Sequence, residues 1–318
     1  MSLWAGRGWL LALAAFAALS AGLAGGATAT ALANPPAPNP AEGYAIKLTR
    51  PLRAGEKYDF TADATVVQSL TANISGQTRT LRPRSVSVHF EGTEQILAVN
   101  AQGDPIKARY TVTQCVAREG KKEVTVVPPG GVVTVDAGKW KSRMDVDQGG
   151  LTIQDELVLR AVLSLPNLDG TSEDDRFGTD KRQKVGESWP VRADAVMRAV
   201  VSSANVRVKK QDVSGTVKLA ALETVDGVAC LRVQGKSRIE HFLPPATDLP
   251  ENSRVEDSTF EYKFTKLVPA DPSGHCMMDS HSVNVLLKLR TDEASIGPDI
   301  LVDGKLLRTV GIKRRPLR

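Results

Sequence analysis

The sequence has few aromatic residues, few cysteines and little net charge, and each shortage excludes a class of protein. Aromatic side chains make up 5% of the 318 residues, so a core must be built mainly from aliphatic side chains. The net charge of +5 is too small for the basic surface of a nucleic-acid-binding protein. Neither the Gly-x-Ser-x-Gly nucleophile elbow nor the His-Glu-x-x-His zinc helix occurs. We therefore expect a protein that is not an enzyme, with no cofactor and no nucleic-acid partner.

The long apolar run of the chain lies at its N-terminus. Leu10 to Ala24 follows Arg7 and leads into Ala31-Leu32-Ala33, the arrangement of an export signal. At about 15 residues the run is shorter than the roughly 20 that span a bilayer as a helix. We expect residues 1–33 to be removed and the product to be periplasmic or extracellular. Because no cysteine lies near the cleavage site, we expect no lipid anchor.

Three cysteines remain for the exported chain: Cys115, Cys230 and Cys276. An oxidising compartment permits one disulfide and leaves one thiol over, and the sequence does not decide among the three pairings. The alternative is three separate thiols, packed as small apolar residues. All three remain candidates for the disulfide.

Alternating apolar residues predict strands through most of the chain after a proline-rich leader at 34–43. Tyr58 to Val66 alternates with period two, and the pattern returns repeatedly up to Ser282–Leu289. Asp226-Gly227 and Asp303-Gly304 are typical of hairpin turns. The pattern predicts a mainly β, β-rich α+β fold of antiparallel meander sheets.

Two stretches instead fit a helical period, one in each half of the chain. Ile153 to Leu165 places apolar residues on one helical stripe, with acidic residues in its first turn. Asp194 to Ser203 reads as a second helix, with a strand as the competing interpretation because of its β-branched residues. We therefore expect about one helix packed on the sheet of each half.

An acidic stretch divides the two halves. We expect an N-terminal half at 44–168, a solvated acidic connection at 169–183, a C-terminal half at 184–312 and a basic tail at 313–318. The tail could contact an anionic surface weakly, or simply be solvated.

One internal similarity suggests that the halves are related by duplication. Arg53-Ala-Gly-Glu-Lys-Tyr-Asp-Phe60 and Lys184-Val-Gly-Glu-Ser-Trp-Pro-Val191 share the order basic, small, Gly, Glu, any, aromatic. In this frame Gly55 and Gly186 provide a turn, and Tyr58 and Trp189 place an aromatic anchor in the core.

The second of these segments also carries a family resemblance. Val185-Gly-Glu-Ser-Trp189, followed by a helix and a hairpin, resembles a loose group of exported bacterial β-rich proteins of unknown function. The resemblance implies a β-rich exported fold and brings no activity and no site residues.

The densest group of possible metal ligands is His275-Cys-Met-Met-Asp-Ser-His281. On an extended strand His275, Met277, Asp279 and His281 would share one face, and Cys276 adds a thiol. His275 and His281 would then lie roughly 20 Å apart, so one ion could reach both only if the segment bends. The competing interpretation is a loop that leads into a strand.

These observations favour an exported, soluble binding or envelope-associated structural module, whose partner is an envelope component or an apolar ligand. The first alternative is a periplasmic carrier of a lipid or another apolar ligand, held by a curved sheet covered with a helix. The second is an enzyme of unrecognised type, which would bring polar residues with perturbed pKa values together.

Overall fold

The structure is a computed structural model that describes residues 42–74, 76–80, 84–138, 142–147, 149–165, 171–245, 247, 249, 252–275, 277–293 and 297–317. The predicted signal peptide at 1–33, nearly all of the leader and Cys276 lie outside the described residues. None of the helices in the described part is both long and apolar enough to span a membrane.

The described strands form one open antiparallel sheet, which confirms the predicted β-rich fold class. The strands of the first half are β1 (Lys57–Ile74), β2 (Gln77–Thr80), β3 (Arg84–Val99), β4 (Pro105–Glu119), β5 (Lys122–Thr125), β6 (Val132–Asp136) and β7 (Arg143–Val146). Those of the second half are β8 (Ser188–Pro190), β9 (Val213–Val225), β10 (Val228–Glu240), β11 (Ser253–Pro269), β12 (Met278–Glu293) and β13 (Gly297–Pro316).

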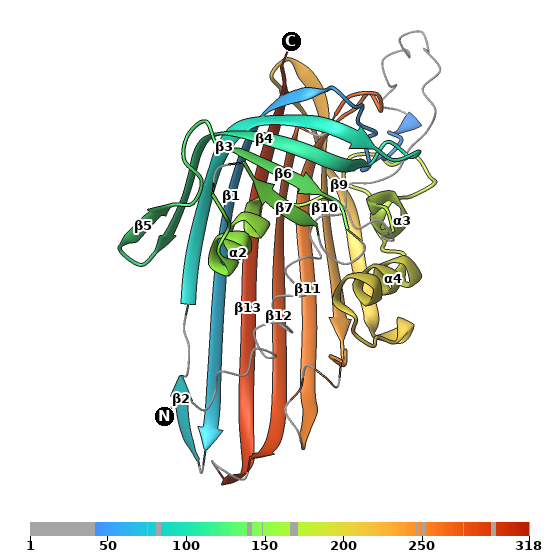
Figure 1. Cartoon of the computed structure of the whole chain (residues 1–318). Coiled ribbons are helices and arrows are strands. Elements are labelled where there is room, and N and C mark those ends of the chain that lie inside the picture. Colours follow the sequence, from blue (N-terminus) through green and yellow to red (C-terminus); the bar gives the residue numbers. More distant parts are fainter. Residues whose placement is uncertain are drawn as a thin grey trace.

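The order across the sheet is β7-β6-β4-β3-β1-β13-β12-β11-β10-β9-β8, with β2 added to β1 and β5 to β4. The last strand, β13, therefore pairs with the first, β1, in the middle of the sheet, as in Ala64 opposite Val310. Figure 1 shows β1, β13, β12 and β11 as long neighbouring strands, with β3 and β4 bending across one end of the sheet. The two predicted halves thus share one sheet instead of forming two.

Helices pack on one face of this sheet, which we call the inner face. They are α2 (Ile153–Val162), α3 (Glu173–Phe177) and α4 (Ala193–Ala204), with a short 3-10 turn, η3, at Lys210–Asp212. Helix α2 lies on β1, β3 and β13, and α4 lies on β9. Both predicted helices are present, and for 194–203 the helical interpretation was the correct one.

Local chemistry explains where these helices begin and end. Thr152 and Asp155 form a capping box at the start of α2, in which each side chain accepts from the other residue's backbone N–H. Helix α4 ends at Asn205, whose φ of 52° is the left-handed conformation common at helix C-termini.

The inner face carries two main clusters of buried apolar side chains. One gathers residues of β1, β3, β4 and β6 beneath α2, and the other gathers β9 to β13 with α3, α4 and Trp189. A smaller cluster of Ala72, Ile300 and Val302 lies near the far end of β1 and β13. The core is thus continuous along the long strands and is built mainly from aliphatic residues.

Three local predictions differ from the structure. Asp303-Gly304 forms no turn but lies within β13, where Asp303 is opposite both Thr71 and Lys288. The acidic connection is not solvated throughout, because Glu173 in α3 is only 2% exposed. The basic tail is largely the end of β13, and its Arg314, with a 10% exposed side chain, pairs with the buried Glu94 at 2.6 Å.

Candidate functional site

Side chains on the inner face of the long strands form rows, because residues directly opposite each other in paired strands point to the same side of the sheet. One row holds Lys266, Asp279 and Ile312, and the next holds Phe264, His281 and Val310. A third row runs from Ser237 on β10 through Tyr262 and Val283 to Arg308 on β13. These rows bring six polar side chains together in the middle of an otherwise apolar face.

A buried cluster of charges lies in the first row. The Lys266 ammonium is 2.6 Å from Glu173 Oε2 of α3 and 2.8 Å from Asp279 Oδ2 of β12. The exposed fractions of the three side chains are 0%, 3% and 8%. Charges this deep persist only when they are paired, so Lys266 joins α3 to the sheet electrostatically.

The two carboxylates of this cluster respond differently to their surroundings. Burial alone would raise the pKa of Asp279, but Lys266 and His281 outweigh it and hold that pKa well below the ordinary range. Burial raises the pKa of Glu173, and Lys266 offsets this only in part. Asp279 is therefore the charged partner of Lys266, and Glu173 is the carboxylate that accepts a proton first on acidification.

His281 lies between the charge cluster and Tyr262. Its Nδ1 is 3.5 Å from Asp279 Oδ1, and its ring centroid is 5.9 Å from that of Tyr262. The side chain is 2% exposed, its Nδ1 interacts with Asp279 across that distance, and its Nε2 has no hydrogen-bond partner among the described residues. Burial lowers the pKa of His281, so the ring is neutral near pH 7.

Ser237 is a second buried polar group of this kind. The residue is 1% exposed, and its hydroxyl has no hydrogen-bond partner in the described part of the chain. It is directly opposite Tyr262, the pKa of whose hydroxyl is raised by burial and by the charges of Asp279 and Glu173. Tyr262 is therefore protonated, and it lies between the Ser237 hydroxyl and the His281 ring.

Arg308 is the member of the third row on β13, and the row continues to Val66 on β1. Its Nη2 donates hydrogen bonds to the carbonyl oxygens of Arg160 and Ala161, at 3.2 and 2.9 Å, near the C-terminal end of α2. The residue is 2% exposed, and burial lowers its pKa to about 10. It therefore stays cationic at neutral pH, where the negative end of the helix dipole favours its charge.

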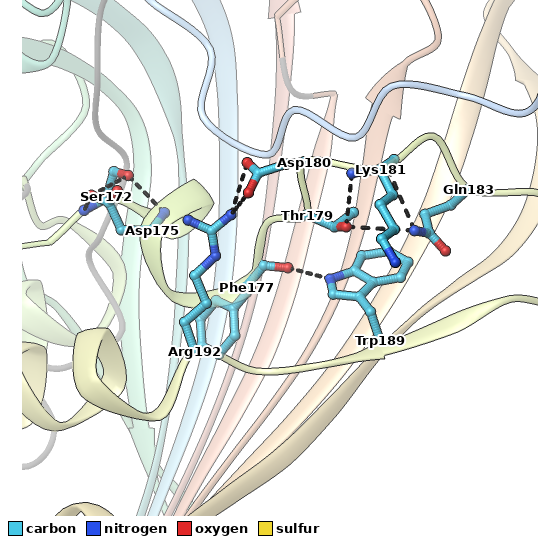
Figure 2. A network of polar contacts seen from close by, with 9 residues as sticks. All are labelled: Ser172, Asp175, Phe177, Thr179, Asp180, Lys181, Gln183, Trp189 and Arg192. Carbon is cyan, nitrogen blue, oxygen red and sulfur yellow. Dashed lines mark hydrogen bonds and ion pairs between the residues drawn. The ribbon is translucent and has the colours of Figure 1, made fainter.

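Helix α3 covers the polar rows from the inner side. The ring of Phe177 stacks on Tyr262 with centroids 5.7 Å apart and lies 4.9 Å from that of Phe264. Trp189 holds this helix in place, because its Nε1 donates to the Phe177 carbonyl at 2.8 Å (Figure 2). Figure 2 also shows Arg192 paired with Asp180 beside the helix, at 2.9 Å.

The predicted metal ligands are not brought together. His275 lies against the end of β1, with its Nε2 3.5 Å from Glu56 Oε1 and its ring 5.4 Å from that of Tyr58. Asp279 and His281 instead belong to the inner rows, and Cys276 lies outside the described residues. Among the described residues no group of three or more His, Cys, Asp or Glu side chains is arranged to hold a metal ion.

The other cysteines are buried thiols in the structure. Burial raises the pKa of Cys115 to about 11, which makes that thiol unreactive. The Sγ atom of Cys230 is 3.4 Å from Sδ of Met277. A disulfide that involves Cys276 remains a prediction.

The two repeated segments adopt closely similar turns. Gly55 and Gly186 have φ values of 93° and 95°, which side chains rarely allow. The Arg53 and Lys184 backbone N–H groups donate to the glutamates three residues later, at 2.9 and 2.7 Å. Tyr58 and Trp189 are 1% and 7% exposed, so both aromatics lie in the core. Duplication itself remains a prediction.

Sequence reasoning missed Lys266 and Ser237, placed Glu173 in a solvated connection, and treated Arg308 as one of several C-terminal basic residues. A signal for Lys266 was present, because it continues the alternation of Ser258, Phe260, Tyr262 and Phe264 and therefore takes an inward position. No comparable signal pointed to Glu173, which meets Lys266 across 93 residues of sequence.

No known protein family matches this chain. No curated protein is detectably similar to it in sequence. Among solved structures it is similar to a lipovitellin studied for its lipid–protein interactions, with a TM-score of 0.31 and 12% identity over 84% of this chain. The chain spans about a quarter of that protein, 26% of its length.

Other solved structures are similar at lower scores. A DUF1329 family protein from Desulfovibrio piger has a TM-score of 0.16 and 11% identity, over 80% of this chain and 83% of that one. The P. putida toluene transporter TodX has a TM-score of 0.15 and 6% identity, over 84% of this chain and 91% of that one. At such scores these similarities carry no argument about function, which must come from the site itself.

Proposed function

We propose that this protein is an exported binding protein that holds an apolar molecule against the inner face of its long strands. The observation that carries the proposal is the composition of the rows beyond Arg308. On β1 and on β10 to β13 the described residues of these rows include no charged side chain; they are Gln68, Leu70, Ala72, Ile239, Ser253, Val255, Ser258, Phe260, Val285, Leu287, Leu289, Thr291, Ile300, Val302, Gly304 and Leu306. Charged residues border the rows beyond β1, where Arg84 of β3 is opposite Gln68 and Arg79 of β2 is opposite Ala72. An apolar surface of this extent is suited to a hydrocarbon chain.

The arrangement of the helices supports the same conclusion. Helix α2 meets β13 near Arg308, and α4 lies on β9. Figure 1 shows β1, β13, β12 and β11 extending well beyond both helices. The apolar rows thus extend beyond both helices, and their side chains are buried in the structure, as in Leu289 and Leu306 at 0% exposed.

The dimensions and the energetics are adequate for an acyl chain. The eight-residue rise from Val283 to Thr291 along β12 is about 26 Å at ~3.3 Å per residue. One leaflet of acyl chains is roughly 15 Å thick, half of a hydrocarbon core of ~30 Å. Each methylene removed from water contributes about 0.8 kcal/mol, from which the entropy cost of association is subtracted.

The first test asks whether the exported protein carries an apolar molecule. Native mass spectrometry of protein purified from its producing cells should show extra mass that denaturation releases, and solvent extraction should recover that molecule. The purified protein should also bind Nile red, an uncharged dye whose fluorescence rises in apolar surroundings. A protein that carries no such molecule and does not bind the dye would contradict the proposal.

Two matched variants locate the site. Leu70→Glu puts a carboxylate on the inner face of β1, whereas Val67→Glu puts the same charge on the outer face of that strand, where Val67 is 37% exposed. We expect Leu70→Glu to weaken Nile red binding at least about tenfold, since a carboxylate on this face has to be desolvated when an apolar molecule covers it. Val67→Glu should change the affinity for Nile red less than about twofold, because Val67 lies on the exposed outer face. Equal effects of the two variants, with circular dichroism as in the wild type, would show that the dye binds elsewhere.

A further inference from the structure

The side chains that face outward on and beside helix α4 form one surface. They are Arg198, Val201, Arg207, Lys209 and Leu243, all exposed, and we call them the α4 surface. Arg198 and Val201 are three residues apart on α4 and therefore share one face of the helix. Arg207 pairs with Leu243 in a β-bridge, in which each backbone N–H donates to the other residue's carbonyl at 2.9 Å. Because η3 contacts α4, the chain between them keeps these side chains close together.

The three cations of the α4 surface form no ion pair with any residue that the structure describes. They are Arg198, Arg207 and Lys209. Of the carboxylates beside them, Asp194 is engaged with Lys210 at 2.8 Å. Asp212 has a 15% exposed side chain and lies 3.8 Å from His241. The α4 surface therefore presents positive charge that is not compensated within the described fold.

Two apolar side chains lie among these cations. Val201 is 40% exposed and Leu243 is 38% exposed, although the adjacent residues Val200 and Phe242 are buried. Leu243 is directly opposite Arg207, so their side chains point to the same side. At a bilayer surface, apolar side chains enter the boundary between head groups and acyl chains, and neighbouring cations attract anionic lipids. The α4 surface combines both properties.

We infer that the α4 surface docks the protein onto an anionic phospholipid bilayer. Each Lys or Arg near such a surface contributes about fivefold to the affinity, so three of them contribute about 100-fold. The buried side of α4, with Val196 and Val200, packs in the same core cluster as Phe260 and Leu306 of the apolar rows. Docking therefore brings those rows close to a membrane. It goes beyond the proposed function, and it is measured without any apolar ligand.

Co-flotation of the purified exported protein with lipid vesicles tests the docking. We expect the protein to bind vesicles of phosphatidylcholine and phosphatidylglycerol in equal parts, and to bind phosphatidylcholine alone at least about tenfold less tightly. Raising the salt from ~0.1 to ~1 M shortens the Debye length from about 10 to about 3 Å and should release most of the protein. Equal binding to both kinds of vesicle, or binding to neither, overturns the inference. Either result leaves the proposed function intact, because Nile red binding is measured without vesicles.

A triple variant tests whether the cations of the α4 surface make the contact. It combines Arg198→Gln, Arg207→Gln and Lys209→Gln, and it should bind the anionic vesicles about 100-fold less tightly than the wild type. The control makes the same change in net charge at exposed residues of the β4–β5 hairpin and of the outer face of β13: Lys121→Gln, Lys122→Gln and Lys305→Gln. Figure 1 shows β5 on the side of the sheet away from α4. The control should lose less than about threefold, and equal losses in the two triple variants would overturn the assignment to the α4 surface.

A double variant distinguishes a bilayer from an anionic polymer as the partner. Val201→Ser with Leu243→Ser keeps every cation and should weaken vesicle binding about tenfold, because less apolar surface enters the bilayer. Val67→Ser with Leu307→Ser is the matched control, since these residues are 37% and 42% exposed and lie opposite each other on the outer face. If the first pair of substitutions leaves vesicle binding unchanged while the triple variant loses it, the surface recognises charge alone. That outcome would favour an anionic polymer and overturn the bilayer as the partner.

Discussion

Replacing Lys266 by methionine tests whether the buried charge cluster is a true ion pair. The substitution keeps the length of the side chain and removes the cation that lies 2.6 Å from Glu173 and 2.8 Å from Asp279. Two carboxylates then remain in a site where their exposed fractions are 3% and 8%. Removing one partner of a buried pair costs about 3–5 kcal/mol, because the remaining charge is uncompensated. We expect the free energy of unfolding at pH 7 to fall by about that amount.

The pH dependence of this loss has a definite sign. In the wild type the pKa of Asp279 is depressed, so its contribution to stability is present above the unfolded pKa of about 3.9 and is lost as the pH falls through the folded pKa. In Lys266→Met, burial without the cation raises the pKa of both carboxylates. They then destabilise the fold increasingly as the pH rises above about 4. The difference in the free energy of unfolding between wild type and variant should therefore widen as the pH rises from about 4.5 to about 7, above the unfolded pKa values of both carboxylates.

Urea unfolding followed by tryptophan fluorescence, to which the buried Trp189 contributes, measures the free energy of unfolding at each pH. Lys263→Met is the matched control, because Lys263 lies on the same strand, pairs with Glu261 and has a 54% exposed side chain. Exposed ion pairs contribute about 0–1 kcal/mol, so this control should be nearly neutral. Equal losses in the two variants, or a loss that does not depend on pH, would refute the ion-pair interpretation of the cluster.

Two further predictions concern packing and titration elsewhere in the sheet. Gly235→Ala should destabilise the protein by about 1–3 kcal/mol in the same urea assay, because the new Cβ would lie 2.2 Å from the Phe264 ring. Gly311→Ala, where no atom lies within 4 Å of the added Cβ, should have nearly no effect, and equal losses would contradict the packing argument. The hydrogen bond that His89 Nδ1 donates to Asp63 Oδ1, at 2.7 Å, raises the pKa of His89, so the contribution of this contact to stability is lost as the pH rises through that pKa. Asp63→Asn should lower the His89 pKa in an NMR titration, and an unchanged midpoint would show that the contact is absent in solution.

The local structure was predictable wherever a periodic pattern has one physical explanation. The alternation from Tyr58 to Val66 is the inner face of β1, and the apolar stripe after Ile153 is the buried side of α2. The turn predicted at Asp303-Gly304 was wrong, because a dipeptide that is common in turns can also lie within a strand that pairs on both sides. The pairing of β13 with β1 has no local signal, since it joins segments at opposite ends of the described chain.

The candidate site was much less predictable than the strands. Asp279 and His281 were singled out as metal ligands from their spacing, whereas the structure uses Asp279 as the partner of Lys266. A sequence shows that two residues share a strand face, but not which residue of another strand or helix meets them. Only the register of β11 against β12 brings Lys266 opposite Asp279, and only the placement of α3 adds Glu173.

The register of β11 against β12 suggests a role for the charge cluster other than its contribution to the free energy of unfolding. A buried ion pair is often no more stable than a well-packed apolar replacement, so its contribution to stability is a weak reason to retain it. A slip of one residue between β11 and β12 would, however, place either Lys266 or Asp279 on the opposite face of the sheet and leave the other charge buried alone. The slip would also break the order of the rows, in which Tyr262, His281 and Arg308 stand together beside the apolar surface. The cluster therefore penalises the misaligned pairings that would destroy the proposed ligand site. A triple variant with apolar residues at Lys266, Asp279 and Glu173 should accordingly fold, yet bind Nile red less tightly than the wild type if its register is no longer unique.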